Sequence, residues 1–251
     1  MLPPGFERLL LGHAVAVARS DVAVGIRASL LGADGTRSTL YEYAARHPGA
    51  RHLQGRGTAY AVTLPQSPIR VVVRHNRRGG LFAPIFEDRF LPPTRAPKEL
   101  EVSLALSRLG IDTPDIVAYA LYPPGGLLQR SDVCSREIPA SRDLSHVLTG
   151  EGASERGAAL LATAQLVARL ARVGARHHDL NAKNVLLTLE MAYVLDVDRV
   201  TLGGKPDATL DANLKRLTRS LRKWRDHFHA RISERDISEL ETNARRALLN
   251  G

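Results

Sequence analysis

Residues 177–187, His-His-Asp-Leu-Asn-Ala-Lys-Asn-Val-Leu-Leu, are followed by Tyr-Val-Leu-Asp-Val-Asp at 193–198, and these two segments are the most informative part of the sequence. Asp179 and Asn184 precede an apolar strand, Leu189-Glu190 predicts a tight turn, and a second apolar strand ends at Asp196. A phosphotransfer site has this order: the first Asp accepts a hydroxyl proton, while the Asn and the later Asp give oxygens to Mg²⁺. Mg²⁺ suits such a pair because phosphates and water complete its octahedron. We predict Asp179 as the catalytic residue and Asn184 and Asp196 as metal ligands.

The same residue types also have a purely structural interpretation. Asp and Asn are common in turns, so an isolated His-x-Asp or Asp-x-Asp predicts only a turn. Here the spacing, the two strands and their order agree together, which favours the phosphotransfer interpretation.

Length and composition are typical of a soluble enzyme. The chain has 251 residues, 44% of them hydrophobic, which is enough to bury a core in one or two units. The single Cys134 excludes an internal disulfide and suggests a reducing compartment. No apolar run approaches the roughly 18 residues of a spanning helix. The stretch from Leu9 to Val17 lacks a leading basic cluster and a cleavage site, so we do not interpret it as a signal peptide.

The charge is the one unusual feature of the composition. The formal net charge is +9 and the pI is about 10.2. Such a chain attracts something anionic: nucleic acid, a membrane surface or a phosphorylated substrate.

The first 50 residues contain little recognisable chemistry. Residues 6–17 and 22–30 are mildly periodic, and residues 40–46 predict a short helix that ends before Pro48-Gly49. We interpret residues 1–50 as an extension that decorates the lobe after it.

Gly55 and Gly57 open an alternating strand, and we predict that they bind nucleotide phosphates. Two close glycines let backbone amides approach phosphate oxygens, although the same pair also occurs in hairpin turns. The next strand, residues 69–74, ends at Arg74, where a kinase-like small lobe has the cation that contacts the α and β phosphates. A helix is predicted over residues 95–109, and Glu99 lies in its first turn. Glu99 either pairs with Arg74 or is simply an acid near a helix N-terminus.

Residues 117–121 and 127–133 predict the last two strands of a small antiparallel sheet. The segment 136–139, Arg-Glu-Ile-Pro, then leaves the sheet as a connector whose backbone can bind an adenine edge, which makes Glu137 a nucleotide-binding candidate. Three helices are predicted after it, over residues 157–173, 214–228 and 233–249, and Gly174 caps the first. Six cations lie on the second helix: Lys215, Arg216, Arg219, Arg222, Lys223 and Arg225. They form either a solvated face or one that attracts an anionic substrate.

Five motifs carry a resemblance to a known family. They are Gly-Arg-Gly-Thr at 55–58, Val-Arg-His-Asn-Arg-Arg-Gly-Gly-Leu at 73–81, Asp-Leu-Asn-Ala-Lys-Asn-Val-Leu-Leu at 179–187, Leu-Asp-Val-Asp-Arg at 195–199 and Asn-Leu-Lys-Arg-Leu-Thr-Arg-Ser-Leu at 213–221. From Gly55 to about Lys223 the chain resembles the lipopolysaccharide-kinase branch of the protein-kinase-like superfamily, most closely its 3-deoxy-D-manno-octulosonic acid (Kdo) kinases. In that family the strand cation is commonly Arg, which supports Arg74.

The resemblance implies an α+β, bilobal protein-kinase-like fold. We expect an N-terminal lobe over residues 1–137, with an extension (1–50) and a small antiparallel nucleotide-binding sheet with one main helix (51–137). A mostly helical catalytic lobe is expected over residues 138–251. The implied reaction is transfer of the ATP γ-phosphoryl group, with Mg²⁺, to a hydroxyl of Kdo-lipid A at the cytoplasmic face of a Gram-negative inner membrane. An anionic glycolipid and an anionic membrane surface both suit the basic chain, and no nucleic-acid partner is expected.

The chain departs from protein kinases at several positions. His178 replaces a common Arg, Asp-Val-Asp at 196–198 replaces the Asp-Phe-Gly triplet, and no Ala-Pro-Glu follows. We therefore expect neither control by loop phosphorylation nor a protein substrate.

Other classes of protein remain possible. A heptose kinase shares the pattern, and so does an aminoglycoside- or choline-type phosphotransferase, which usually has an acidic cleft. A pseudokinase or a module that binds anionic surfaces would explain the charge. It would not explain why Asp179, Asn184 and Asp196 are all present.

Overall fold

The computed structural model describes residues 2–31, 37–53, 58–75, 94–122, 130–150 and 152–250. The chain divides into two compact units, Met1–Ser103 with Pro114–Glu137, and Leu104–Thr113 with Ile138–Gly251. The segment Leu104–Thr113 was predicted to lie in the first lobe, and it belongs to the second unit instead. Its Asp112 explains why: the carboxylate pairs with Arg169 at 2.5 Å, and the carbonyl oxygen accepts the amide of Val194 at 2.9 Å.

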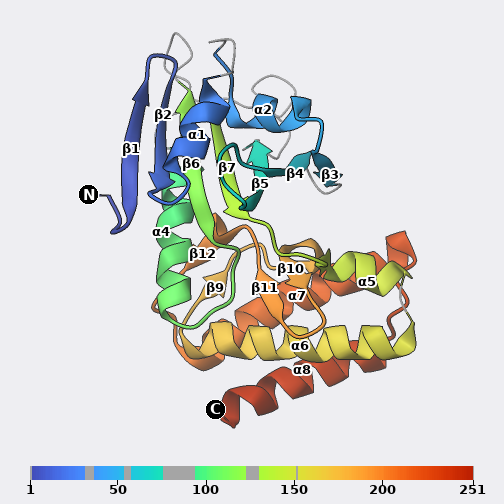
Figure 1. Ribbon diagram of the computed structural model, residues 1–251. Coiled ribbons are helices and arrows are strands. Elements are labelled where there is room, and N and C mark those ends of the chain that lie inside the picture. The colour runs from blue at the N-terminus through green and yellow to red at the C-terminus, as the bar shows by residue number, and fades with distance from the viewer. Residues whose placement is uncertain are drawn as a thin grey trace. The chain divides into compact units, whose positions relative to one another are not determined.

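A seven-stranded antiparallel sheet forms the first unit, in the order β1-β2-β6-β7-β5-β4-β3 (Figure 1). Its strands are β1 (Phe6–Leu11), β2 (Ala14–Arg19), β3 (Arg51–Leu53), β4 (Ala59–Thr63), β5 (Arg70–His75), β6 (Ile116–Tyr122) and β7 (Arg130–Arg136). The N-terminal region is therefore more than a decoration, since β2 pairs with β6 and extends the sheet.

Two helices cover one face of this sheet, α1 (Ala23–Leu30) and α2 (Leu40–Arg46) (Figure 1). Ile26 and Leu40 are buried there in one apolar core with strand residues such as Val71 and Val117. The predicted helix at 40–46 is confirmed. Thr39 begins it with a capping box, which satisfies amides of the first turn.

A buried carboxylate joins α2 to the sheet. Asp132 of β7 is fully buried, contacts Nδ1 of His75 at 2.5 Å, and accepts hydrogen bonds from the Tyr122 hydroxyl and the Tyr41 amide, both at 2.9 Å. The Tyr122 oxygen in turn accepts the amide of Leu40 at 2.8 Å. Burial, and then the neighbouring Asp132, raise the pKa of Tyr122. This phenol therefore stays neutral and remains a donor.

Replacing Asp132 by alanine should lower the free energy of unfolding by about 3 kcal/mol, because it leaves buried donors without their acceptor. Urea unfolding measures this change. Asp115→Ala is the control: this carboxylate is 54% exposed and lies 3.8 and 3.9 Å from two arginines, a type of pair that contributes about 0–1 kcal/mol. Equal losses in the two variants would contradict a structural role for Asp132.

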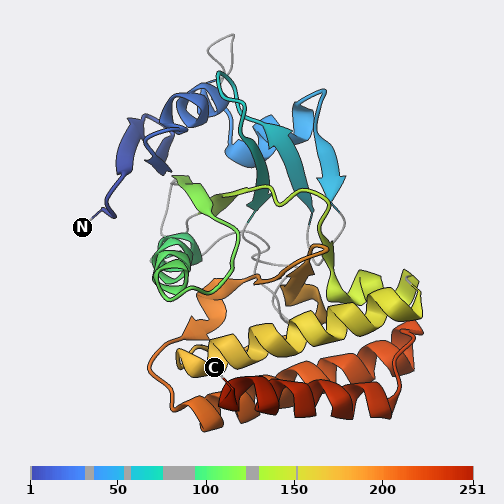
Figure 2. The same cartoon turned by 60° about the horizontal axis from the view of Figure 1, so that its bottom comes forward.

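Helices dominate the second unit. They are α5 (Leu144–Gly150), α6 (Ala153–Arg172), α7 (Pro206–Phe228) and α8 (Glu234–Leu249), and α6 packs against both α7 and α8 (Figure 2). The helix α4 (Arg95–Arg108) begins in the first unit and ends in the second. Short strands complete the second unit: β8 (Arg142–Asp143), β10 (Val185–Leu187) and β11 (Ala192–Val194) in one sheet, and β9 (Arg176–His177) with β12 (Val200–Thr201) in another.

Gly174 ends α6 with φ +66°, as its predicted capping role requires. A Cβ there would collide with the backbone of Gly204, whose amide bonds the Gly174 carbonyl at 3.0 Å. Among the described residues, no helix is both long enough and apolar enough to cross a membrane.

Candidate active site

The loop after β9 is held by a buried histidine, His177. Its Nδ1 accepts the amide of Asp179 at 3.1 Å, so its Nε2 carries the proton and donates to the Leu195 carbonyl at 2.9 Å. Burial lowers the pKa of His177, although the bond to Leu195 opposes the shift. The ring is therefore neutral near pH 7 and fastens the Asp179 loop to the end of β11. This role of His177 was not predicted from the sequence, although the His-x-Asp spacing is a signal for it.

Asn184 lies in the 3-10 turn Ala182–Asn184, is 3% exposed, and makes a second link within the loop. Its Nδ2 donates to the Asp179 carbonyl at 2.9 Å, and its own carbonyl accepts the Leu195 amide at 2.9 Å. With Nδ2 used in this way, Oδ1 is the side-chain atom that Asn184 can offer to a cation. The structure thus brings the Asp179 and Asn184 backbones together with residue 195, next to Asp196.

Asp196 has left-handed backbone angles, φ 54° and ψ 46°. A non-glycine residue pays about 1–2 kcal/mol for this conformation, and Asp tolerates it better than most. Strained residues of this kind cluster at functional sites. The conformation begins the short turn Val197–Arg199, whose Arg199 amide bonds the Asp196 carbonyl at 3.2 Å.

The predicted metal ligands have the right chemistry for Mg²⁺. Asn184 and Asp196 supply an amide oxygen and a carboxylate, and Mg²⁺ takes oxygen ligands and needs only one or two from protein. Within the described part of the chain, no cluster of three His, Cys, Asp or Glu side chains offers a site of another type.

In the first unit, the predicted ion pair between Arg74 of β5 and Glu99 of α4 is present. The Glu99 side chain is only 6% exposed and that of Arg74 is 29% exposed. An acid at this depth needs a cationic partner, which explains why Glu99 lies against Arg74 and is not merely a helix-terminal acid. The predicted phosphate-binding glycines, Gly55 and Gly57, lie outside the described residues.

Glu137 is held by two arginines. Its carboxylate pairs with Arg51 at 2.5 Å and Arg70 at 2.7 Å, and its amide bonds the Arg70 carbonyl at 3.0 Å. Burial would raise the pKa of Glu137, but Arg70 and Arg51 together lower it. The side chain and the amide of Glu137 are thus occupied by Arg51 and Arg70. Of the groups predicted to bind the nucleotide, its carbonyl oxygen is the one that we retain as a candidate.

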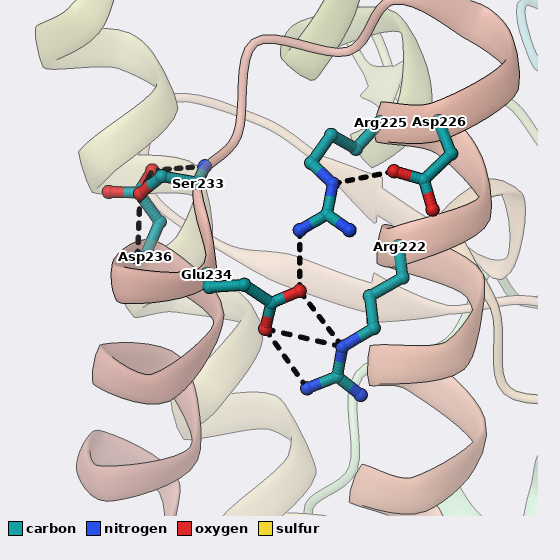
Figure 3. Close-up of polar contacts among 6 residues, drawn as sticks. All are labelled: Arg222, Arg225, Asp226, Ser233, Glu234 and Asp236. Atoms are coloured by element: carbon teal, nitrogen blue, oxygen red, sulfur yellow. Dashed lines mark hydrogen bonds and ion pairs between the residues drawn. The ribbon is translucent and has the colours of Figure 1, made fainter.

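The cations of α7 do not form one solvated face, contrary to the simplest expectation. Figure 3 shows Arg222 and Arg225 of α7 bound to Glu234 at the start of α8, with closest distances of 3.1 and 2.5 Å. Arg225 also pairs with Asp226 at 2.7 Å. The two pairs with Glu234 link α7 to α8.

A third α7 arginine contacts the loop that contains Asp179. Arg216 donates from Nη2 to Oδ1 of Asp179 at 2.7 Å, although the two residues are 37 positions apart. The apolar stripe of this helix is buried at Leu214, Leu217 and Leu221 but reaches the surface at Phe228, which is 48% exposed.

The antiparallel sheet of the first unit and the helices of the second are the parts of a kinase-like fold. Two solved structures share the fold: "Amicoumacin kinase hAmiN in complex with AMP-PNP, Ca2+ and Ami", with a TM-score of 0.54, 11% identity and coverage of 82% of this chain and 72% of that one, and "WaaP in complex with acyl carrier protein", with a TM-score of 0.50, 16% identity and coverage of 85% and 83%.

The sequence profile of the lipopolysaccharide kinase (Kdo/WaaP) family matches residues 45–243, and the chain belongs to this family. The 3-deoxy-D-manno-octulosonic acid kinase of Stenotrophomonas maltophilia (strain K279a) is 34% identical over 191 residues, 74% of each chain. The enzyme of the same name from Vibrio parahaemolyticus is 31% identical over 191 residues, 74% of this chain and 78% of that one.

Proposed function

We propose that this kinase transfers the γ-phosphoryl group of ATP to a hydroxyl of Kdo in Kdo-lipid A, at the cytoplasmic face of the inner membrane of a Gram-negative cell. The observation that carries the proposal is the Asp179 loop, fastened through His177 and Asn184 to the residue before Asp196. The identity of the acceptor sugar is inferred from the relatives, which are named 3-deoxy-D-manno-octulosonic acid kinases.

In this proposal Asp179 accepts the proton of the attacking sugar hydroxyl, and Asn184 and Asp196 hold Mg²⁺. When bound, Mg²⁺ neutralises charge on the β and γ phosphates. Arg74, held by Glu99, binds the nucleotide phosphates through its planar guanidinium. The amides of Gly55 and Gly57 and the carbonyl oxygen of Glu137 are the other proposed nucleotide contacts.

An assay of phosphate transfer from ATP tests the proposal directly. Purified protein is offered Kdo-lipid A and, separately, heptosylated core, and the phosphorylated position is located by mass spectrometry. We expect transfer to Kdo. Transfer only to heptose would support a heptose kinase, and transfer to neither acceptor would overturn the proposed substrate class.

The Arg74–Glu99 pair should act as one unit in nucleotide binding. We expect Arg74→Ala and Glu99→Ala each to weaken ATP binding by about tenfold or more, because a desolvated charge-assisted pair typically contributes about 1.5–3 kcal/mol. In the double variant, the loss of ATP-binding free energy should be smaller than the sum of the losses in the two single variants. Titration calorimetry measures all three, and strict additivity would argue against coupling. Arg74→Lys should not restore the full affinity for ATP, since the point charge of an ammonium does not replace the planar set of donors of a guanidinium.

We also propose that α7 draws the protein to its anionic lipid-linked acceptor. Lys215, Arg219 and Lys223 are spaced four residues apart, so they share one helix face. All three are exposed and form no ion pair with any residue that the structure describes. Each exposed Lys or Arg near an anionic membrane contributes roughly 1 kcal/mol to the free energy of membrane binding.

Changing Lys215, Arg219 and Lys223 together to glutamine should raise the KM for Kdo-lipid A in anionic vesicles about tenfold or more at low salt. It should leave kcat nearly unchanged, because screened long-range attraction acts on association. A control with the same change in net charge replaces three exposed cations of α8, Arg235, Arg245 and Arg246, of which the first two pair with Glu239 and Asp211. Should both triple variants bind vesicles equally well, the α7 face is only solvated surface.

A further inference from the structure

One face of α7 lies along residues 175–183, the loop that contains Asp179. Asn213, Arg216, Ser220 and Trp224 are spaced three, four and four residues apart, which places them in a single stripe. This stripe differs from the buried one that contains Leu214, Leu217 and Leu221.

Two members of the stripe, Asn213 and Ser220, form hydrogen bonds with the loop backbone. Asn213 is fully buried, its Oδ1 accepts the His177 amide at 2.9 Å, and its Nδ2 donates to the Ala175 carbonyl at 3.1 Å. Two turns later, the Ser220 hydroxyl oxygen accepts the amide of Ala182 at 3.1 Å. Both bonds fix the path of the loop but touch no side chain of the proposed machinery.

The other two members contact charged side chains. The ammonium of Lys183 lies 5.5 Å from the centre of the Trp224 ring, within the range of a cation–π contact. Arg216 donates to Oδ1 of Asp179 at 2.7 Å. The contacts run in the same order along both segments, so docking α7 aligns the whole loop and places one guanidinium on the carboxylate proposed as the base.

We infer that Arg216 is a positioning residue, which selects the side-chain rotamer of Asp179 in which this carboxylate accepts the acceptor's proton. The inference rests on the proposed function, since it takes Asp179 to be the base. The side chains of Asp179 and Arg216 are 35% and 42% exposed, and exposed ion pairs contribute only about 0–1 kcal/mol to stability. Stabilising the fold is therefore a minor effect of this pair.

Orientation is the larger effect, because displacing a reacting group by about 1 Å costs on the order of 10²-fold in rate. A guanidinium suits this task, since its donors are fixed in a plane, whereas an ammonium rotates on a flexible stem. Arg216→Gln should therefore lower kcat by about 10- to 100-fold. The KM for ATP and the thermal unfolding midpoint should stay close to those of the wild type. Arg216→Lys should recover part of kcat.

The matched control is Arg222→Gln. Arg222 lies on the same helix, is 45% exposed and pairs with the exposed Glu234, so its loss removes an equivalent ion pair away from the loop. All variants are assayed with Kdo-lipid A in micelles of a neutral detergent. Arg222→Gln should keep the wild-type kcat. A loss of kcat in Arg222→Gln equal to that in Arg216→Gln would overturn the inference.

The decisive measurement adds Arg216→Gln to Asp179→Asn. A residue that acts only through the Asp179 carboxylate should cost little once that carboxylate is gone, so the double variant should match Asp179→Asn within about twofold. An undiminished loss in the double variant would show that Arg216 acts elsewhere. A raised acceptor KM with unchanged kcat would show that it binds the acceptor. Either result overturns the positioning role.

Failure of the proposed function is recognised separately. If the wild type transfers no phosphate to Kdo-lipid A, the substrate assignment fails, and the same set of variants is compared by ATP hydrolysis with water as acceptor. An Arg216 effect that depends on Asp179 would survive in that assay, whereas equal hydrolysis by wild type and Arg216→Gln would overturn the inference as well.

Discussion

Replacing Asp196 by alanine should abolish phosphoryl transfer, with a fall in kcat of at least about 10³-fold. Phosphoryl transfer depends on positioning and on neutralising charge, so the carboxylate that would hold Mg²⁺ is the most costly side chain to lose. A second readout does not depend on turnover. In the wild type, Mg²⁺ should increase the thermal stabilisation given by a non-hydrolysable ATP analogue, and in Asp196→Ala this increase should disappear.

The left-handed backbone at Asp196 requires a matched series of variants. Alanine removes the carboxylate but also tolerates φ 54° poorly, so a lost activity alone would be ambiguous. Asp196→Gly relieves the backbone, and Asp196→Asn keeps a residue that tolerates this region while removing the charge. We expect both variants to be as stable as the wild type and still nearly inactive. Recovery of turnover in Asp196→Gly would contradict the metal-ligand role.

The parts of the fold that the sequence predicted correctly are those set by local signals. The helix at 40–46 has its own cap and stop, and Gly174 ends α6 where a left-handed residue is needed. The role of β1 and β2 was missed because it is not local: β2 pairs Val15 with Leu121, more than 100 residues later. β1 is an edge strand in which only Leu9 is buried, so its periodicity is weak.

The candidate site shows the same division. Asp179, Asn184 and Asp196 lie on one short loop and the strands beside it, where spacing alone indicates their proximity. The Arg216–Asp179 and Arg222–Glu234 pairs depend on how α7 docks, which a run of six cations cannot specify. The Arg74–Glu99 pair was one of two alternatives for Glu99, and the sequence could not choose between them because it does not reveal that the Glu99 side chain is only 6% exposed.

The loop contacts of Asp179 allow Asp179→Asn to remove the carboxylate without removing the backbone bonds that hold the loop. Apart from the side-chain bond with Arg216, the bonds that hold this residue in the loop use its backbone: the amide donates to His177 at 3.1 Å, and the carbonyl accepts Asn181 at 2.8 Å and Asn184 at 2.9 Å. Asparagine leaves these bonds in place and changes only the side chain. The loop geometry and ATP binding should therefore survive.

The rate of transfer should not survive, because an amide cannot accept the hydroxyl proton as a carboxylate does. General base catalysis typically contributes about 10²–10⁴-fold, and we expect kcat of Asp179→Asn on Kdo-lipid A to fall within that range while the Kd for ATP changes less than about threefold. Rapid-quench transfer and nucleotide titration measure the two quantities. Turnover close to wild type on the true acceptor would remove Asp179 from the role of base. A joint loss of transfer and ATP binding would show instead that the carboxylate holds the nucleotide site together.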